Sequence, residues 1–181
     1  YIFEPEVINL IPSGVEFDIG SELFPLILQR NLPFNAIDAP FSWIDIGHLS
    51  DFWQANQQLM RGKLRGVSMP GTEIRPGIWT GLNVDADWDD IQVEGPIYVG
   101  SASRIEAGCQ IFGPSWIGHG CHIESGANIS RSILFDYSRI GSSGKLKDSL
   151  VFGRNCVDQF GNAIANDNGI FDWVGDTRDS F

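Results

Sequence analysis

The sequence lacks several features that would place it in a specialised class of protein. No run of about 18 apolar residues occurs in its 181 residues, so no segment is expected to span a membrane. Lys and Arg number only 12 against 23 Asp and Glu, whereas nucleic-acid binding needs a basic surface. No basic, apolar leader opens the chain, so no export signal is predicted. These absences predict a soluble cytoplasmic protein that binds neither nucleic acid nor membrane.

Cysteine is also scarce, with three residues at Cys109, Cys121 and Cys156. The odd number leaves at least one thiol unpaired. Cys109 and Cys121 would lie in different columns of the repeat described next, which disfavours a disulfide between them. We therefore expect reduced cysteines that serve packing in a reducing compartment.

The sequence does contain a strict sixfold repeat. An apolar residue occupies every sixth position from 93 to 129, at Val93, Val99, Ile105, Ile111, Ile117, Ile123 and Ile129. Neither an α-helix, with a period of about 3.6, nor a flat strand, with a period of about 2, produces this spacing. A coil with three six-residue sides does, because each side sends one aliphatic residue into the axis. The repeat predicts a parallel β-helix.

The rest of the repeat defines its corners and its limits. Small residues are expected where the chain turns against the next coil, at Ser103, Cys109, Ser115, Cys121 and Ala127. After one short step the inward positions continue as Leu134, Ile140, Leu146 and Phe152. Upstream, the acidic segment 85–90 interrupts the register and is predicted to be a loop thrown out of one coil. Residues 63–164, at about 18 per turn, predict about five coils.

Residues 1–62 show no such repeat and predict a piece of an α/β domain. Strands are expected at 1–3, 34–37 and 42–46, and helices at 4–8, 21–30 and 49–60. About 60 residues with so few strands would bury too little surface to be stable alone. We infer the truncated edge of a larger α/β domain, followed by the β-helix at 63–164 and a tail at 165–181. In the tail, 170–174 is expected to fold back as a cap and the last residues to be disordered.

Four sequence blocks before the repeats point to a family. They are the segment 1–8, the F-D-x-G-x-x-L-F-P run from Phe17 to Pro25, the W-x-D-x-G run from Trp43 to Gly47, and Ala55-Asn56. Together with the hexapeptides, they resemble the nucleoside-diphosphate-sugar pyrophosphorylases, of mannose-1-phosphate guanylyltransferase and glucose-1-phosphate nucleotidyltransferase type. The resemblance implies a left-handed β-helix and the C-terminal portion of such an enzyme. It also implies an inactive fragment, because the family's glycine-rich nucleotide loop and first metal-binding aspartate belong to an N-terminal half absent from this sequence.

The resemblance also implies a chemistry. Joining a nucleoside triphosphate to a sugar 1-phosphate brings two polyanions together, so the reaction needs a divalent cation, held by carboxylates and substrate phosphates. By resemblance, Asp45 is one of the magnesium ligands, and Tyr1 and Trp43 line the sugar site. No catalytic side chain and no cofactor-binding residue is assigned. The alternatives are that Asp45 caps the following turn and that Tyr1 and Trp43 are core aromatics.

Two other functions fit a hexapeptide β-helix. In an acyltransferase, His119 or His122 would act as general base. A zinc site with three histidine ligands is not expected, because the coils contain only these two histidines. Alternatively, the coils have no chemistry and serve assembly or regulation. Flat coil sides with aromatic residues are natural self-association surfaces, so a homo-oligomer through the β-helix is expected. The residues expected on those sides are Ile97, Tyr98, Phe112, Trp116, Phe135 and Tyr137.

Overall fold

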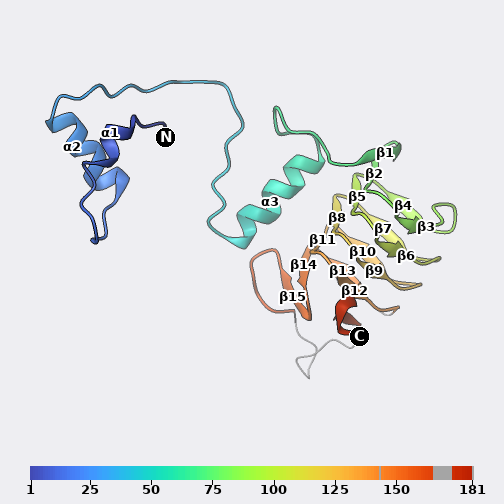
Figure 1. Ribbon diagram of the computed structural model, residues 1–181. Coiled ribbons are helices and arrows are strands. Elements are labelled where there is room, and N and C mark those ends of the chain that lie inside the picture. The colour runs from blue at the N-terminus through green and yellow to red at the C-terminus, as the bar shows by residue number, and fades with distance from the viewer. Residues whose placement is uncertain (143, 165–172, 181) are drawn as a thin grey trace. The chain divides into compact units, whose positions relative to one another are not determined.

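The computed structural model describes residues 1–142, 144–164 and 173–180 (Figure 1). The chain divides into two compact units, Tyr1–Pro40 and Phe41–Phe181. Among the described residues, none of the helices combines the length and the apolar character needed to cross a membrane.

The first unit is helical. It contains α1 (Pro5–Ile8), the π-helical turn η1 (Ile19–Leu23) and α2 (Phe24–Gln29). Asp18 caps η1, because its side chain accepts hydrogen bonds from the Ser21 amide at 2.6 Å and from the Ser21 hydroxyl at 2.8 Å. These bonds hold the pKa of Asp18 below its ordinary value. Four aromatic rings cluster beside α2, from Tyr1, Phe3, Phe24 and Phe34.

The three strands predicted before residue 62 are absent, at 1–3, 34–37 and 42–46, so that prediction was wrong. Between residues 1 and 71 the structure contains no strand with which these segments could pair. An unpaired strand leaves its backbone N–H and C=O groups without partners, so an apolar, β-branched segment alone does not form one. The helix predictions fared better. The helix expected at 21–30 is formed as η1 and α2, and the helix expected at 49–60 is α3 (Leu49–Met60).

The second unit contains the predicted parallel β-helix. Its three sheets have the strand orders β1-β2-β5-β8-β11-β14-β15, β13-β10-β7-β4 and β16-β12-β9-β6-β3. All described pairings between successive coils are parallel, and the antiparallel pairs within the described residues are those of β1 with β2, β15 with β14 and β16 with β12. The strand bounds are β1 (Thr72–Arg75), β2 (Ile78–Thr80), β3 (Asp85–Ala86), β4 (Gln92–Glu94), β5 (Ile97–Val99), β6 (Arg104–Ile105), β7 (Gln110–Phe112), β8 (Ser115–Ile117), β9 (His122–Ile123), β10 (Asn128–Ser130), β11 (Ile133–Leu134), β12 (Ser138–Ile140), β13 (Lys145–Lys147), β14 (Ser149–Phe152), β15 (Asn155–Asp158) and β16 (Val174–Asp176).

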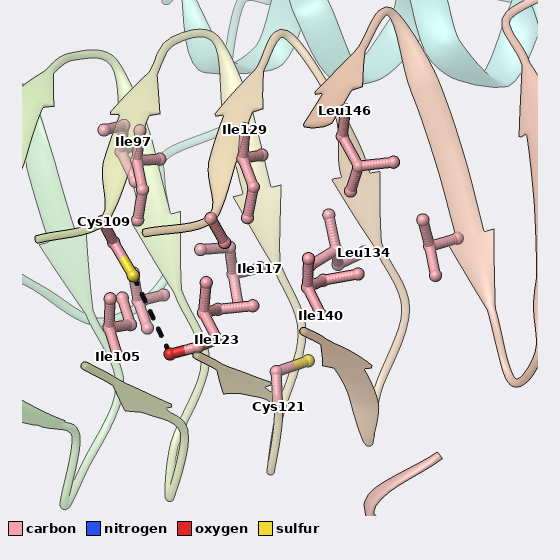
Figure 2. Packing of buried hydrophobic residues seen from close by; sticks show 14 of the residues in the cluster. Ile97, Ile105, Cys109, Ile117, Cys121, Ile123, Ile129, Leu134, Ile140 and Leu146 are labelled. Carbon is pink, nitrogen blue, oxygen red and sulfur yellow. Dashed lines mark hydrogen bonds between the residues drawn. The ribbon is translucent and has the colours of Figure 1, made fainter. Parts of the chain in front are cut away.

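The inward residues stack in columns, as the repeat predicts. Strand register places Val99, Ile117 and Leu134 in one column and Val93, Ile111 and Ile129 in another. Figure 2 shows Ile117, Leu134 and Ile129 from these columns directed into the interior of the coils. The small residues at the corners are equally buried: Ser103, Cys109, Ser115 and Ala127 have 0 % exposure and Cys121 has 1 %. The core is therefore a ladder of aliphatic residues closed at its corners by small ones.

The register differs from the prediction at two places. Val151, and not Phe152, stacks on Leu134, so a second five-residue step follows Leu146 and turns Phe152 outward. Segment 85–90 is not a loop thrown out of a coil. Asp85 and Ala86 form β3 and pair with Arg104 and Ile105, and the register shifts by only one residue before Val93.

The β-helix contains four complete turns and begins a fifth at β14, slightly fewer than the five expected. The predicted number of coils was too high because the ends of the segment 63–164 are not part of any coil. β1 and β15 instead fold back antiparallel on β2 and β14. Antiparallel return strands cover the terminal edges of the first sheet, which would otherwise expose unpaired backbone groups.

Helix α3 packs on the side of the β-helix that carries Phe135, and Figure 1 shows it beside β8 and β11. The Phe52 ring stacks on Phe135 at 5.7 Å, and the Trp53 indole donates to the Arg131 carbonyl at 3.2 Å. Ile97 and Tyr98, expected on an open flat side, are 0 % and 4 % exposed. Ile97 belongs to the interior core and Tyr98 packs on Trp116 at 4.2 Å, so neither lies on an open face, and α3 itself occupies the part of this side that carries Phe135.

Tryptophans pack against both ends of the coil interior. Trp88 packs on the core near the first coil, and Trp173 packs on it beside Gly141 and Gly144 of the last. Val174 begins β16, which pairs with β12. Residues 173 and 174, at the end of the cap predicted at 170–174, thus contact the coils, while 170–172 lie outside the described residues.

The end of the chain departs from the prediction. Among the last residues, which are expected to be disordered, Thr177–Ser180 form the 3-10 helix η2. The Thr177 amide donates to the Tyr137 carbonyl at 2.7 Å, and Arg178 lies over the Tyr137 ring at 4.7 Å. Arg178 also pairs with Asp176, which lowers the pKa of Asp176 to about 2. These contacts fix the conformation of a polar segment whose composition alone predicts disorder.

All three cysteines are free and buried, as predicted. Burial raises the pKa of Cys121 to about 12 and that of Cys156 to about 11, and it also raises the pKa of Cys109. Figure 2 shows Cys109 and Cys121 pointing into the core, with the Cys109 thiol directed at the Ile123 carbonyl. The thiols therefore remain protonated at neutral pH and act as small apolar residues.

Candidate metal-binding segment and its surroundings

Asp45 lies in an exposed extended segment that is fixed at both ends. At one end the Ser42 hydroxyl accepts a hydrogen bond from the Arg65 amide at 3.0 Å. At the other, His48 caps α3, and Asp51 accepts from the His48 amide at 2.9 Å in a capping box. Gly47 leaves room beside this cap, because a Cβ there would lie 3.9 Å from Asp51 Oδ2. Asp45 therefore presents a free carboxylate from a short, anchored strap.

Two of the three predicted site residues, Trp43 and Asp45, belong to the second unit, and Tyr1 belongs to the first. Trp43 belongs to the same strap as Asp45 and is 72 % exposed. Tyr1 belongs to the first unit, is 91 % exposed and meets Phe24 edge-on at 5.0 Å. Neither aromatic is buried among the described residues. Their assignment to a sugar site stays a prediction, as does the magnesium role of Asp45.

A magnesium site built from this strap would be incomplete within the described residues. No group of three or more His, Cys, Asp or Glu side chains that could hold a metal occurs among them. Magnesium is commonly held by one or two carboxylates and completed by water and substrate phosphates, so a single exposed carboxylate fits as one ligand. The donor type and its accessibility suit the ion.

A largely apolar cavity of about 710 Å³ lies between α3 and the coils of the second unit. Ile46, the neighbour of Asp45, forms part of its wall, and so do Ala55 and Asn56 from α3. The Asn56 Oδ1 atom is buried and has no hydrogen-bond partner within the described residues. The cavity adjoins the Asp45 strap, but its wall provides no phosphate-binding loop.

The two histidines considered for acyl transfer are engaged in the coil framework. His119 Nδ1 accepts a hydrogen bond from the Ser101 amide at 3.0 Å, so in the neutral ring its proton lies on Nε2. His122 Nε2 lies 2.8 Å from Glu106, and this contact lowers the pKa of the Glu106 carboxyl. Both side chains bind neighbouring coils to each other, which accounts for their presence without catalysis.

Sequence reasoning missed the residues that fasten α3 to the β-helix. Gln57 is 2 % exposed, and its Nε2 donates to the Pro114 carbonyl at 3.1 Å. In the sequence, Gln57 stands among apolar helix positions at 52, 59 and 60, which only weakly indicates that it is buried. Its hydrogen-bond partner could not be identified, because that partner lies 57 residues later in the chain. Only the Gln57 side chain's near-complete burial reveals its role.

Comparisons with known proteins agree with the sequence blocks. Residues 1–62 match the nucleotidyl transferase family. The chain is 49 % identical to a UTP–glucose-1-phosphate uridylyltransferase of Synechocystis over 174 residues, which are 96 % of this chain and 45 % of that protein. It is 30 % identical to a mannose-1-phosphate guanylyltransferase of Mycobacterium tuberculosis over 128 residues, 61 % of this chain and 35 % of that one.

A glucose-1-phosphate adenylyltransferase of Desulforamulus reducens is more distant, at 24 % identity over 77 % of this chain and 31 % of its own length. The chain thus spans less than half the length of these curated relatives. The family match ends at residue 62, where the hexapeptide region was predicted to begin. Residues 1–62 thus match the nucleotidyl transferase family, the residues after them form a hexapeptide β-helix, and over 96 % of its length the chain is similar to a sugar-1-phosphate nucleotidyltransferase.

Proposed function

We propose that the protein containing this chain transfers a nucleotidyl group from a nucleoside triphosphate to a sugar 1-phosphate. An oxygen of the sugar phosphate attacks the α-phosphorus, the bond from that phosphorus to the bridging oxygen of the β-phosphate breaks, and pyrophosphate leaves. The observation that carries the proposal is the 49 % identity to the uridylyltransferase across 96 % of the chain. UTP with glucose 1-phosphate is the first substrate pair to test.

The proposed role of Asp45 is to hold magnesium at the phosphates. Magnesium supplies neutralisation of phosphate charge when bound, and the protein's own contribution is orientation of the reactants. The exposed carboxylate and its two anchors support this role, because a ligand held on a fixed strap needs little reorganisation on binding. Trp43, which shares the strap, and Tyr1 are proposed to contact the sugar.

Replacing Asp45 by asparagine tests the proposal in a protein that joins this chain to the first half of a nucleotidyl transferase domain. Asparagine keeps the shape but loses the charge, so kcat/KM for pyrophosphate release is expected to fall about 100-fold, equivalent to about 2.7 kcal/mol. The matched control is Asp38→Asn, in an exposed, extended part of the first unit, where no loss is expected. Normal magnesium-dependent turnover by the Asp45 variant would remove this residue from the site.

We further propose that the protein self-associates through the β-helix. Phe135, Tyr137 and Phe152 are 39 to 41 % exposed at the mouth of the apolar cavity, and an apolar rim of this kind favours burial against another surface. Sedimentation equilibrium is expected to show a dimer or larger species that Phe152→Ser weakens, while Leu82→Ser, at the first coil, has no effect. A monomer at every concentration would contradict the proposal.

A further inference from the structure

Helix α3 lies along the stack of coils and contacts successive coils with successive turns. Trp53 and Gln57, four residues apart, donate to the carbonyls of Arg131 and Pro114, which occupy the same corner in adjacent coils. Four helical residues rise by about 6 Å, and adjacent coils are spaced by about 4.8 Å. The helix repeat and the coil repeat are close enough for both donors to reach their acceptors.

The two carbonyls are available because hydroxyl groups divert the usual ladder bonds. One coil earlier, the Ser115 amide donates to the Pro96 carbonyl at 3.1 Å, as in an ordinary parallel ladder. In the next coil, the Ser132 amide donates to the Ser115 hydroxyl at 3.3 Å, and the Pro114 carbonyl accepts from Gln57 instead.

The following coil repeats the arrangement. The Ser149 amide donates to the Ser132 hydroxyl at 3.2 Å, and the Arg131 carbonyl accepts from the Trp53 indole. The corner serines thus turn two backbone carbonyls into a docking site for α3.

The contact at Gln57 is the more demanding of the two. Its side chain is 2 % exposed, and the opposite amide atom, Oε1, is buried and has no hydrogen-bond partner among the residues that the structure describes. A buried acceptor left unpaired costs about 1 to 3 kcal/mol, so the site tolerates this polar group at an energetic disadvantage. An apolar side chain would fill the space without that penalty, whereas only a donor satisfies the Pro114 carbonyl. The geometry points to positional specificity as the role of Gln57.

Helix placement determines where Asp45 is held. The capping box between His48 and Asp51 begins α3 only three residues after Asp45, and the Ser42 anchor fixes the other end of the strap. We propose that Gln57 is a positioning residue for Asp45, and that the β-helix is the platform against which the metal-binding strap is set. The effect of Gln57 on magnesium binding rests on the proposed role of Asp45. The effect of Gln57 on the position of the strap does not.

Gln57→Glu tests the inference on the present chain by amide hydrogen exchange. At neutral pH glutamate has no proton to donate to the Pro114 carbonyl, so exchange in 42–60 is expected to rise about tenfold while the amides of β8 and β11 stay protected. At pH 4, protonated glutamate can donate, and the difference from the wild type is expected to shrink. The matched control is Gln54→Glu on the exposed face of the same helix, which should leave exchange unchanged.

The structural claim, that α3 holds the strap, and the catalytic claim, that the strap binds magnesium, can be refuted independently. Unchanged exchange at 42–48 in a variant whose α3 amides are deprotected would show that the helix does not hold the strap, and would overturn the inference. In the active protein, Gln57→Glu is expected to raise the KM for magnesium about tenfold with kcat changed less than threefold. A lower kcat with an unchanged KM for magnesium would contradict a positioning role for Gln57. If the wild type has no transferase activity at all, the proposed function is refuted, but the exchange result remains valid.

Discussion

Ile117→Ala is expected to lower the free energy of unfolding by about 4 kcal/mol, because it removes a fully enclosed residue from the aliphatic ladder. Ile117 has 0 % exposure and stacks between Val99 below and Leu134 above. The coils cannot collapse around the vacancy, since their spacing is fixed by backbone hydrogen bonds on all three sides. Urea denaturation followed by circular dichroism would measure the change.

Two further variants calibrate this prediction. Ile117→Val deletes a single methylene group and should cost about 1 kcal/mol. Leu82→Ala removes an apolar side chain that is 77 % exposed, so its effect should stay within about 0.5 kcal/mol. Equal midpoints for Ile117→Ala and Leu82→Ala would show that residue 117 does not lie in a packed interior.

Gly100→Ala is expected to destabilise the fold by about 3 kcal/mol, through overpacking of two backbones. A Cβ at this position would lie 2.5 Å from the Gly118 carbonyl carbon and 2.7 Å from the His119 nitrogen. Both are main-chain atoms of the next coil, so neither can rotate away, and the coils must separate locally. The loss should appear as a lower urea midpoint and as faster amide exchange near 100 and 118.

Gly175→Ala is the control for that substitution. It also lies in the β-helix, in β16, but a Cβ there would have its nearest neighbour at 3.8 Å, an ordinary contact with the Arg139 Cβ. Its stability should be close to that of the wild type. If Gly100→Ala were equally well tolerated, the close approach of the second and third coils would be excluded.

The interior of the β-helix could be predicted from sequence because its cause is local and periodic. Each aliphatic residue is six positions from the next, and each corner needs a small side chain. The same reasoning identified the five-residue step from Ile129 to Leu134 but missed the second one, after Leu146. Phe152 continues the sixfold spacing, but the chain turns earlier and places Val151 in the column. Either residue is apolar, so composition could not decide between them.

The strands predicted before residue 62 failed for a different reason. Strand formation depends on a partner, and no partner strand occurs between residues 1 and 71. The Asp45 strap shows the same limit at the candidate site. Its residues could be singled out from the W-x-D-x-G block, but its anchors at Ser42 and His48 and the docking of Gln57 depend on contacts distant in sequence or on local capping geometry.

The docking of α3 has a consequence for how the chain acquires its structure during synthesis. Trp53 and its acceptor at Arg131 are separated by 78 residues, so at about 5 to 20 residues per second the helix would wait about 4 to 16 seconds for its acceptor to emerge from the ribosome. A 12-residue helix is marginal by itself in water. The nascent helix would therefore settle only after the third coil has been made, and its apolar face would be open to chaperones until then.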